Sequence, residues 1–141
     1  MKKIIIAGIT GQDGSLLYDY LKSKKFKVIG LSRKRHKEKH IFKTDYSLQS
    51  LSRLINLFKP DEIYNFSGLS NPSASWEKIK ETLEANLYIT VNFLEIIKKK
   101  KKIKYFNSSS SEIFKDSKNK LNENSSIFPI NPYGVAKASS H

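Results

Sequence analysis

The sequence predicts an α/β fold built on a doubly wound parallel sheet. Three observations predict it. Short apolar runs alternate with helical patterns along the chain, a glycine-rich turn joins the first run to the first helix, and serine, tyrosine and lysine follow the last run. Strands that alternate with helices form parallel sheets with right-handed crossovers, and these features together lead to this fold class.

The expected strands are short apolar runs bounded by turn-forming residues. They are residues 2–7, 26–31, 41–44, 61–66 and 103–108. The expected helices carry apolar residues three and four positions apart, along one face. They are residues 13–24, 47–58, 77–98 and a last helix that begins at 132 and includes His141. The polar segments 32–40 and 115–131 are expected to be surface loops.

Composition excludes several classes of protein. The chain of 141 residues suffices for one domain, and the absence of cysteine excludes disulfides and thiolate metal sites. The three histidines do not have the spacing of metal ligands, so we expect no metal. No stretch reaches the roughly 20 apolar residues that cross a bilayer. We expect a cytoplasmic protein without a membrane partner.

The net charge of +13 raises the alternative of a nucleic-acid-binding module. Lysines are spread over the whole chain, however, and the one dense run, residues 98–102, falls at the end of a predicted helix. Cations suit that position because they interact favourably with the helix dipole and the last carbonyls. We therefore expect no nucleic-acid partner, and this alternative ranks last.

The glycine-rich turn, GITGQDG at residues 8–14, stands between the first strand and the first helix. Glycines there let a pyrophosphate approach main-chain N–H groups at a helix N-terminus. The predicted cofactor-binding residues of this turn are Gly8, Thr10, Gly11, Gln12, Asp13 and Gly14. A glycine-rich turn without a ligand is the alternative.

The end of the second predicted strand indicates which nicotinamide cofactor binds. Proteins that use NAD carry an acidic residue there, whereas this chain reads SRKR at residues 32–35. Guanidinium groups bind phosphate in a bidentate manner, so Arg33 and Arg35 favour NADP. The alternative is that both are ordinary surface cations.

Two later segments carry candidate catalytic groups: SSSSE at residues 108–112, and YGVAK with Tyr133 and Lys137. Tyrosine and lysine four positions apart share one helical face. An ammonium near a phenol lowers the phenol pKa, so that tyrosine can act as a general base. The serines end the fifth strand, where this fold places its sites.

These motifs together resemble the extended short-chain dehydrogenase/reductase family of epimerases and dehydratases, with a Rossmann-like fold. Within it the chain is most similar to the GDP-mannose 4,6-dehydratases, through segments in all parts of the sequence. They are ITGQDGSLL at 9–17, EIYNFSGLS at 62–70, SSSSEIF at 108–114 and NPYGVAK at 131–137. The resemblance implies tightly held NADP, a sugar-nucleotide substrate, GDP-mannose, and a homo-oligomer in the full-length form.

The resemblance also implies the role of each site residue. Tyr133 takes the C4 hydroxyl proton and also contacts the cofactor, Lys137 supports Tyr133 and binds the cofactor's ribose, and Ser110 polarises the C4 oxygen. Glu112 removes the C5 proton so that water leaves from C6; an epimerase has no need for this carboxylate. Asp45 matches a position that contacts adenine, and Asn86 matches a structural asparagine, with a helix-surface amide as the alternative.

The chain departs from the family pattern at Ala7, Leu69, Asn71 and Lys115, and most of all in its length. Residues 1–141 are expected to form an incomplete NADP-binding domain without the C-terminal substrate domain, as a fragment or a truncated gene. We expect little or no dehydratase activity from it alone. Another sugar-nucleotide epimerase or dehydratase and a non-catalytic NADP-binding remnant remain alternatives.

Overall fold

The computed structural model describes residues 1–100, 102–115 and 120–141. Lys101 of the lysine run and four positions of the expected loop at 115–131 therefore lie outside the described residues. The chain divides into two compact units. The sheet unit comprises Met1–Ser67 and Ile89–Ser108, and the second unit comprises Gly68–Tyr88 and Ser109–His141. The expectation of a single NADP-binding domain stays a prediction.

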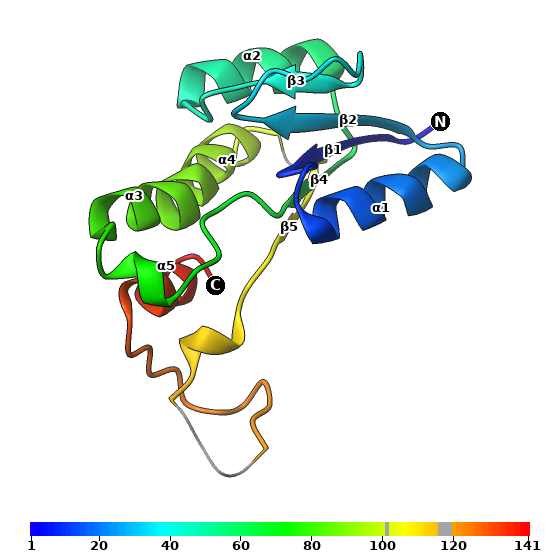
Figure 1. The fold of residues 1–141 in the computed structure, drawn as a ribbon. Helices are drawn as coiled ribbons and strands as arrows, with labels where there is room; N and C mark the ends of the chain where they lie inside the picture. The colour runs from blue at the N-terminus through cyan, green and yellow to red at the C-terminus, as the bar shows by residue number, and fades with distance from the viewer. Residues whose placement is uncertain (101, 116–119) are drawn as a thin grey trace. The chain divides into compact units, whose positions relative to one another are not determined.

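The sheet unit contains five strands that all pair in parallel, in the order β3-β2-β1-β4-β5 (Figure 1). The strands are β1 Lys3–Ala7, β2 Lys27–Ser32, β3 Ile41–Lys43, β4 Glu62–Asn65 and β5 Lys104–Asn107. The sheet grows from β1 in both directions, so the strand order reverses between β1 and β4. The predicted doubly wound α/β fold is confirmed, and each predicted strand is present within two residues of its expected ends.

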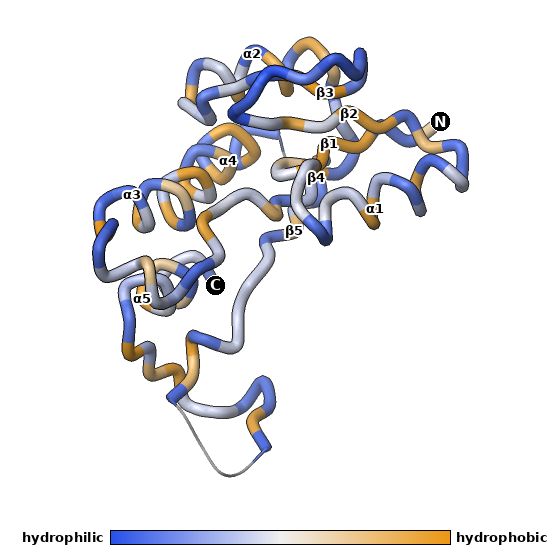
Figure 2. Tube along the Cα trace, in the orientation of Figure 1, coloured by the Kyte–Doolittle hydropathy of each residue, from blue (hydrophilic) through white to orange (hydrophobic). Residues whose placement is uncertain are grey.

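Helices cover both faces of this sheet: α1 (Gln12–Ser23) on one face, and α2 (Leu48–Phe58) and α4 (Ile89–Ile97) on the other. Side chains alternate along β1, because successive residues of a strand point to opposite faces. Ile4 and Ile6 pack with α1, while Ile5 and Ala7 pack with α2 and α4. Burial on both faces explains the continuous hydrophobic colour along β1 in Figure 2.

The helix predicted over residues 77–98 is not one regular α-helix. It consists of α3 (Ile79–Leu83), a π-helical segment η2 (Glu84–Tyr88) and α4. Asn86, in the π-helical segment, is buried and donates from Nδ2 to the carbonyl oxygens of Thr82 and Leu69, at 3.0 and 3.1 Å. It therefore joins the helix to the loop after β4, as a structural asparagine and not as a helix-surface amide.

Besides α3 and η2, the described residues of the second unit form two 3-10 turns and the last helix. They are η1 (Ser73–Ser75), η3 (Ser111–Ile113) and α5 (Pro132–Ser139). An isolated antiparallel bridge pairs Phe114 with Ile127. The prediction that the last helix includes His141 is wrong. The helix ends at Ser139, since Ser140 leaves helical geometry as the C-cap and its hydroxyl donates to the Lys137 carbonyl at 3.1 Å.

Candidate cofactor and catalytic sites

The glycine turn has a backbone that only glycine fits. Gly8 has φ +76°, and a Cβ there would lie 2.8 Å from main-chain atoms of Phe66 and Ser67. A Cβ on Gly14 would overlap the Gly8 carbonyl oxygen. The loop is therefore packed against the end of β4 and against the first turn of α1, as the sequence pattern predicts.

The N-terminus of α1 fits an anion. Its N-cap is Gly11, and no side-chain hydrogen bond from the described residues caps it. Thr10, Gly11, Gln12 and Asp13 are exposed. First-turn N–H groups at an uncapped N-terminus suit a phosphate, so this turn fits the pyrophosphate of a dinucleotide. Asp13 adds a carboxylate to the first turn, where it also complements the helix dipole.

Tyr46 supports this turn and was missed from the sequence. Its side chain is buried, and its backbone has φ +61°. The Gly8 N–H donates to the Tyr46 hydroxyl at 3.1 Å, and the hydroxyl donates to the Leu31 carbonyl at 2.9 Å. Burial raises the pKa of Tyr46 to about 12. The sequence gives no sign of this role for Tyr46 beyond its position after a short predicted strand.

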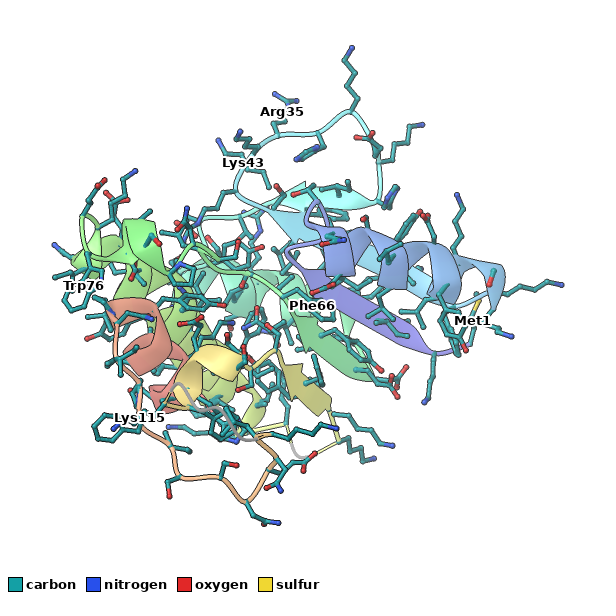
Figure 3. All side chains as sticks on the ribbon, turned by 60° about the horizontal axis from the view of Figure 1, so that its bottom comes forward. Met1, Arg35, Lys43, Phe66, Trp76 and Lys115 are labelled. Atoms are coloured by element: carbon teal, nitrogen blue, oxygen red, sulfur yellow. The ribbon has the colours of Figure 1, made fainter. Side chains whose placement is uncertain are left out.

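The residues predicted to choose the cofactor lie in the same unit. Arg33 and Arg35 follow β2 and are exposed. Arg35 projects from the β2–β3 loop away from the sheet (Figure 3). The charge of Arg33 acts on the Tyr46 phenol and opposes, in part, the rise in its pKa that burial causes. Both guanidinium groups are therefore accessible to a phosphate.

Asp45, predicted to contact adenine, makes local hydrogen bonds. The Ser47 N–H donates to its Oδ1 at 2.9 Å. Hydrogen bonds from Ser50 and Ser47 lower the pKa of Asp45 to about 2. The carboxylate is exposed, and it stabilises the turn that leads into α2.

In the second unit, the predicted catalytic serine and glutamate lie in one 3-10 turn. The Glu112 N–H donates to Ser110 Oγ at 3.2 Å, which makes Ser110 the N-cap of η3. Glu112 Oε2 accepts a hydrogen bond from Asn131 Nδ2 at 2.7 Å. The Ser110 oxygen is thus an acceptor within the turn, while its own O–H can donate to a ligand.

Tyr133 and Lys137 both lie on α5 and are buried, at 8% and 6% exposure. Lys137 Nζ lies 5.9 Å from the centroid of the Tyr133 ring, so the two side chains share one face of the helix as predicted. Burial lowers the pKa of Lys137 below its ordinary value. The Tyr133 N–H donates to Ser75 Oγ at 3.3 Å, which ties the first turn of α5 to η1.

A cavity of about 520 Å³ opens in the second unit beside the serines. Its volume falls in the range of small-molecule sites. Serine hydroxyls and apolar side chains both line it: Ser109, Ser110, Ser111, Ile113, Phe114, Leu121, Asn122, Glu123, Ile127 and His141. Of these lining residues, only Ser110 is predicted from the sequence to be a site residue.

The described part of the chain contains no cluster of three or more His, Cys, Asp or Glu side chains that could hold a metal ion. Among the helices described, none combines the length and the apolar character that a membrane span needs.

The fold and the glycine turn define a Rossmann-like α/β protein. The family model for GDP-mannose 4,6 dehydratase matches residues 5–141. The chain belongs to this family, which confirms the resemblance read from its motifs.

Among relatives, the chain is 29% identical over 161 residues to a GDP-mannose 4,6-dehydratase of Vibrio cholerae, covering 96% of this chain and 43% of that protein. The chain therefore spans less than half the length of that relative.

Among solved structures, the UDP-Glc/GlcNAc 4-epimerase of Campylobacter jejuni is similar to this chain, with a TM-score of 0.90 and 23% identity. The similarity covers 99% of this chain and 47% of that structure's chain. The UDP-glucose 4-epimerase of Thermus thermophilus, in complex with NAD, has a TM-score of 0.86 and 20% identity over 98% and 48%.

Proposed function

We propose that these residues are the cofactor-binding and catalytic part of an NADP-dependent GDP-mannose 4,6-dehydratase, a lyase. The observation that carries the proposal is the hydrogen-bonded connection from Ser110 through Glu112 to Asn131 at the start of α5, the helix of Tyr133 and Lys137. An elimination needs a carboxylate beside the oxidation site, and an epimerisation does not.

The cofactor assignment rests on the glycine turn and on the two arginines. The turn offers uncapped N–H groups to a pyrophosphate, and exposed Arg33 and Arg35 offer guanidinium groups to a 2′-phosphate. The solved relative with bound NAD supports a nicotinamide cofactor. The arginines are the reason to choose NADP.

When bound, the nicotinamide would accept a hydride from C4 of the sugar and return it to C6. The protein's own residues manage the protons. The Tyr133 phenol oxygen accepts the C4 hydroxyl proton, and the Lys137 ammonium lies beside it, with Nζ 5.9 Å from the centroid of the ring. The Ser110 O–H donates to the C4 oxygen. The Glu112 carboxylate takes the C5 proton and gives it to the C6 hydroxyl, which leaves as water. The Tyr133 hydroxyl then returns to C5 the proton that it took from the C4 hydroxyl, which restores the phenol oxygen as the base.

The whole enzyme is proposed to act in the cytoplasm as a homo-oligomer, without a nucleic-acid or membrane partner. Two other functions stay open. A related epimerase would retain Tyr133, Lys137 and Ser110 but would not depend on Glu112. A non-catalytic fragment would bind NADP and turn over no sugar nucleotide.

The first test is calorimetric titration of the 141-residue chain with NADP⁺ and NAD⁺. Selective NADP⁺ binding supports the cofactor assignment, and binding of neither dinucleotide contradicts it. The second test assays GDP-mannose turnover, in the chain and in any longer protein that contains it, with Glu112→Gln beside Glu77→Gln, an exposed glutamate outside the cavity, as the matched control. We expect Glu112→Gln alone to lose dehydration. Equal dehydration by both variants would exclude Glu112 as the base.

A further inference from the structure

Asn131 is bonded at both ends of its side-chain amide. Its Nδ2 donates to Glu112 Oε2 at 2.7 Å, and its Oδ1 accepts the Gly134 N–H at 2.7 Å. The second bond makes Asn131 the N-cap of α5. One side chain thus connects the proposed base to the helix that carries Tyr133 and Lys137, and all of these residues lie in the second unit.

The first turn of α5 is fixed by its surroundings as well. Pro132 has no N–H, the Tyr133 N–H donates to the buried hydroxyl of Ser75, and the Gly134 N–H donates to Asn131. A Cβ on Gly134 would overlap the main-chain carbonyl oxygen of Glu112. The helix backbone therefore packs directly on the backbone of the glutamate segment. The position of the Glu112 main chain relative to α5 is set by this packing, whereas the carboxylate position depends on Asn131.

We propose that Asn131 is a positioning residue for the elimination, and the proposal rests on the function proposed above. Its amide holds one carboxylate oxygen of Glu112 in place and leaves the other to receive the C5 proton. A glutamate side chain has several rotatable bonds, so a carboxylate without this contact would sample other rotamers. Misplacement of a reacting group by about 1 Å can cost on the order of 100-fold in rate.

The competing explanation is that Asn131 serves only as a helix cap. Three substitutions separate the two roles. Asn131→Ser retains a good N-cap and loses the donor to Glu112. Asn131→Asp also retains the cap acceptor, but places a like charge beside the glutamate. Asn131→Ala loses both roles.

The decisive experiment compares thermal unfolding with the two chemical steps on GDP-mannose, in a longer protein that contains this chain and is called the parent here. We expect Asn131→Ser, which loses only the bond to Glu112, to unfold slightly below the parent temperature and Asn131→Ala, which also loses the cap, to unfold further below it. Both should dehydrate roughly 10- to 100-fold more slowly than the parent. C4 oxidation should continue in Asn131→Ser, so that reduced nicotinamide, followed by its near-ultraviolet absorbance, accumulates during a single turnover. A helix cap alone would not produce this accumulation.

The outcomes distinguish this inference from the proposed function. If the parent dehydrates GDP-mannose and Asn131→Ser does so at the parent rate, the inference is overturned and the function stands. If the parent oxidises and dehydrates nothing, the proposed function fails, and the catalytic meaning of the contact fails with it. A double-mutant cycle of Glu112→Ala with Asn131→Ser on unfolding free energy tests the contact separately. We expect non-additive effects, and additive effects would refute the coupling.

Discussion

The phenol oxygen of Tyr46 lies 3.1 Å from the amide nitrogen of Gly8, at the turn where the first strand meets the first helix. The same N–H also lies 3.1 Å from the Leu31 carbonyl oxygen, to which the phenol donates. A buried hydroxyl therefore connects the ends of two neighbouring strands at the proposed pyrophosphate site. Tyr46 therefore helps to shape the proposed pyrophosphate site, although it belongs to none of the motifs recognised in the sequence.

Tyr46→Phe should weaken the fold and the cofactor site together. The substitution removes the hydroxyl's hydrogen bond to the Leu31 carbonyl, which keeps the Gly8 N–H as its partner, so we expect a loss of about 0.5–1.5 kcal/mol of unfolding free energy. Denaturant unfolding and NADP⁺ titration measure the two effects. Tyr20→Phe, on the exposed surface of α1, is the control and should change neither. Similar effects for both variants would contradict the role given to Tyr46.

Replacing Arg33 and Arg35 by alanine should change the choice of cofactor. Each exposed guanidinium offers charge-assisted hydrogen bonds to the 2′-phosphate, so we expect NADP⁺ affinity to fall by roughly 10- to 100-fold. NAD⁺ lacks that phosphate, and its affinity should stay unchanged. Calorimetry on the variant and on Arg53→Ala, an exposed arginine of α2, makes the comparison. A parallel loss of both dinucleotides would mean that the arginines do not select NADP.

Lys137→Met should remove a pH-dependent part of the fold's stability together with a proposed catalytic group. Burial lowers the Lys137 pKa, so keeping the ammonium charged in the folded chain costs free energy at neutral pH. As pH rises from the lowered pKa towards the ordinary value of 10.5, the unfolded chain binds more protons than the folded one. The parent therefore gains stability over that window, and Lys137→Met does not.

Denaturant unfolding over a series of pH values tests this prediction, with Lys78→Met, an exposed lysine, as the control. We expect the stability of Lys137→Met relative to the parent to decrease as pH rises. A constant difference would show that burial does not disfavour the ammonium.

The ionised Asp45 carboxylate should stabilise the fold, and this contribution should be lost at acid pH. Its folded pKa of about 2 lies below the ordinary 3.8, so its contribution is complete above 3.8 and is lost as pH falls through about 2. NMR titration of the carboxyl measures the shift directly. Asp45→Asn should remove this part of the acid sensitivity, while Asp19→Asn, on the exposed face of α1, should retain it. An ordinary titration of Asp45 would contradict the hydrogen bonds from Ser47 and Ser50.

The sequence predicts much of the fold because the signals are local. Each of the five strands is a short apolar run, and the period of apolar residues marks α1 and α2. The π-helical segment could not be predicted, since it accompanies a bond from Asn86 to Leu69, which is distant in the chain. A repeating pattern carries no information about such a partner.

In the candidate site, too, local features can be predicted from the sequence and contacts between distant residues cannot. The glycine turn, the serines and the Tyr133–Lys137 pair can be recognised from spacing, because each lies within one short segment. The contact of Asn131 with Glu112 joins positions 19 residues apart, and that of Tyr46 with Gly8 joins positions 38 apart. Sequence reasoning places Glu112 in the site but cannot identify what orients its carboxylate.

The two compact units have a consequence for the order of synthesis. The ribosome has translated the whole sheet unit once it passes Ser108. The proposed dinucleotide contacts all lie in this unit, except Tyr133 and Lys137. The serine–glutamate turn and α5 come later. Since folding during synthesis proceeds from the N-terminal part onwards, the strands of the sheet leave the ribosome before the proposed proton-transferring residues do.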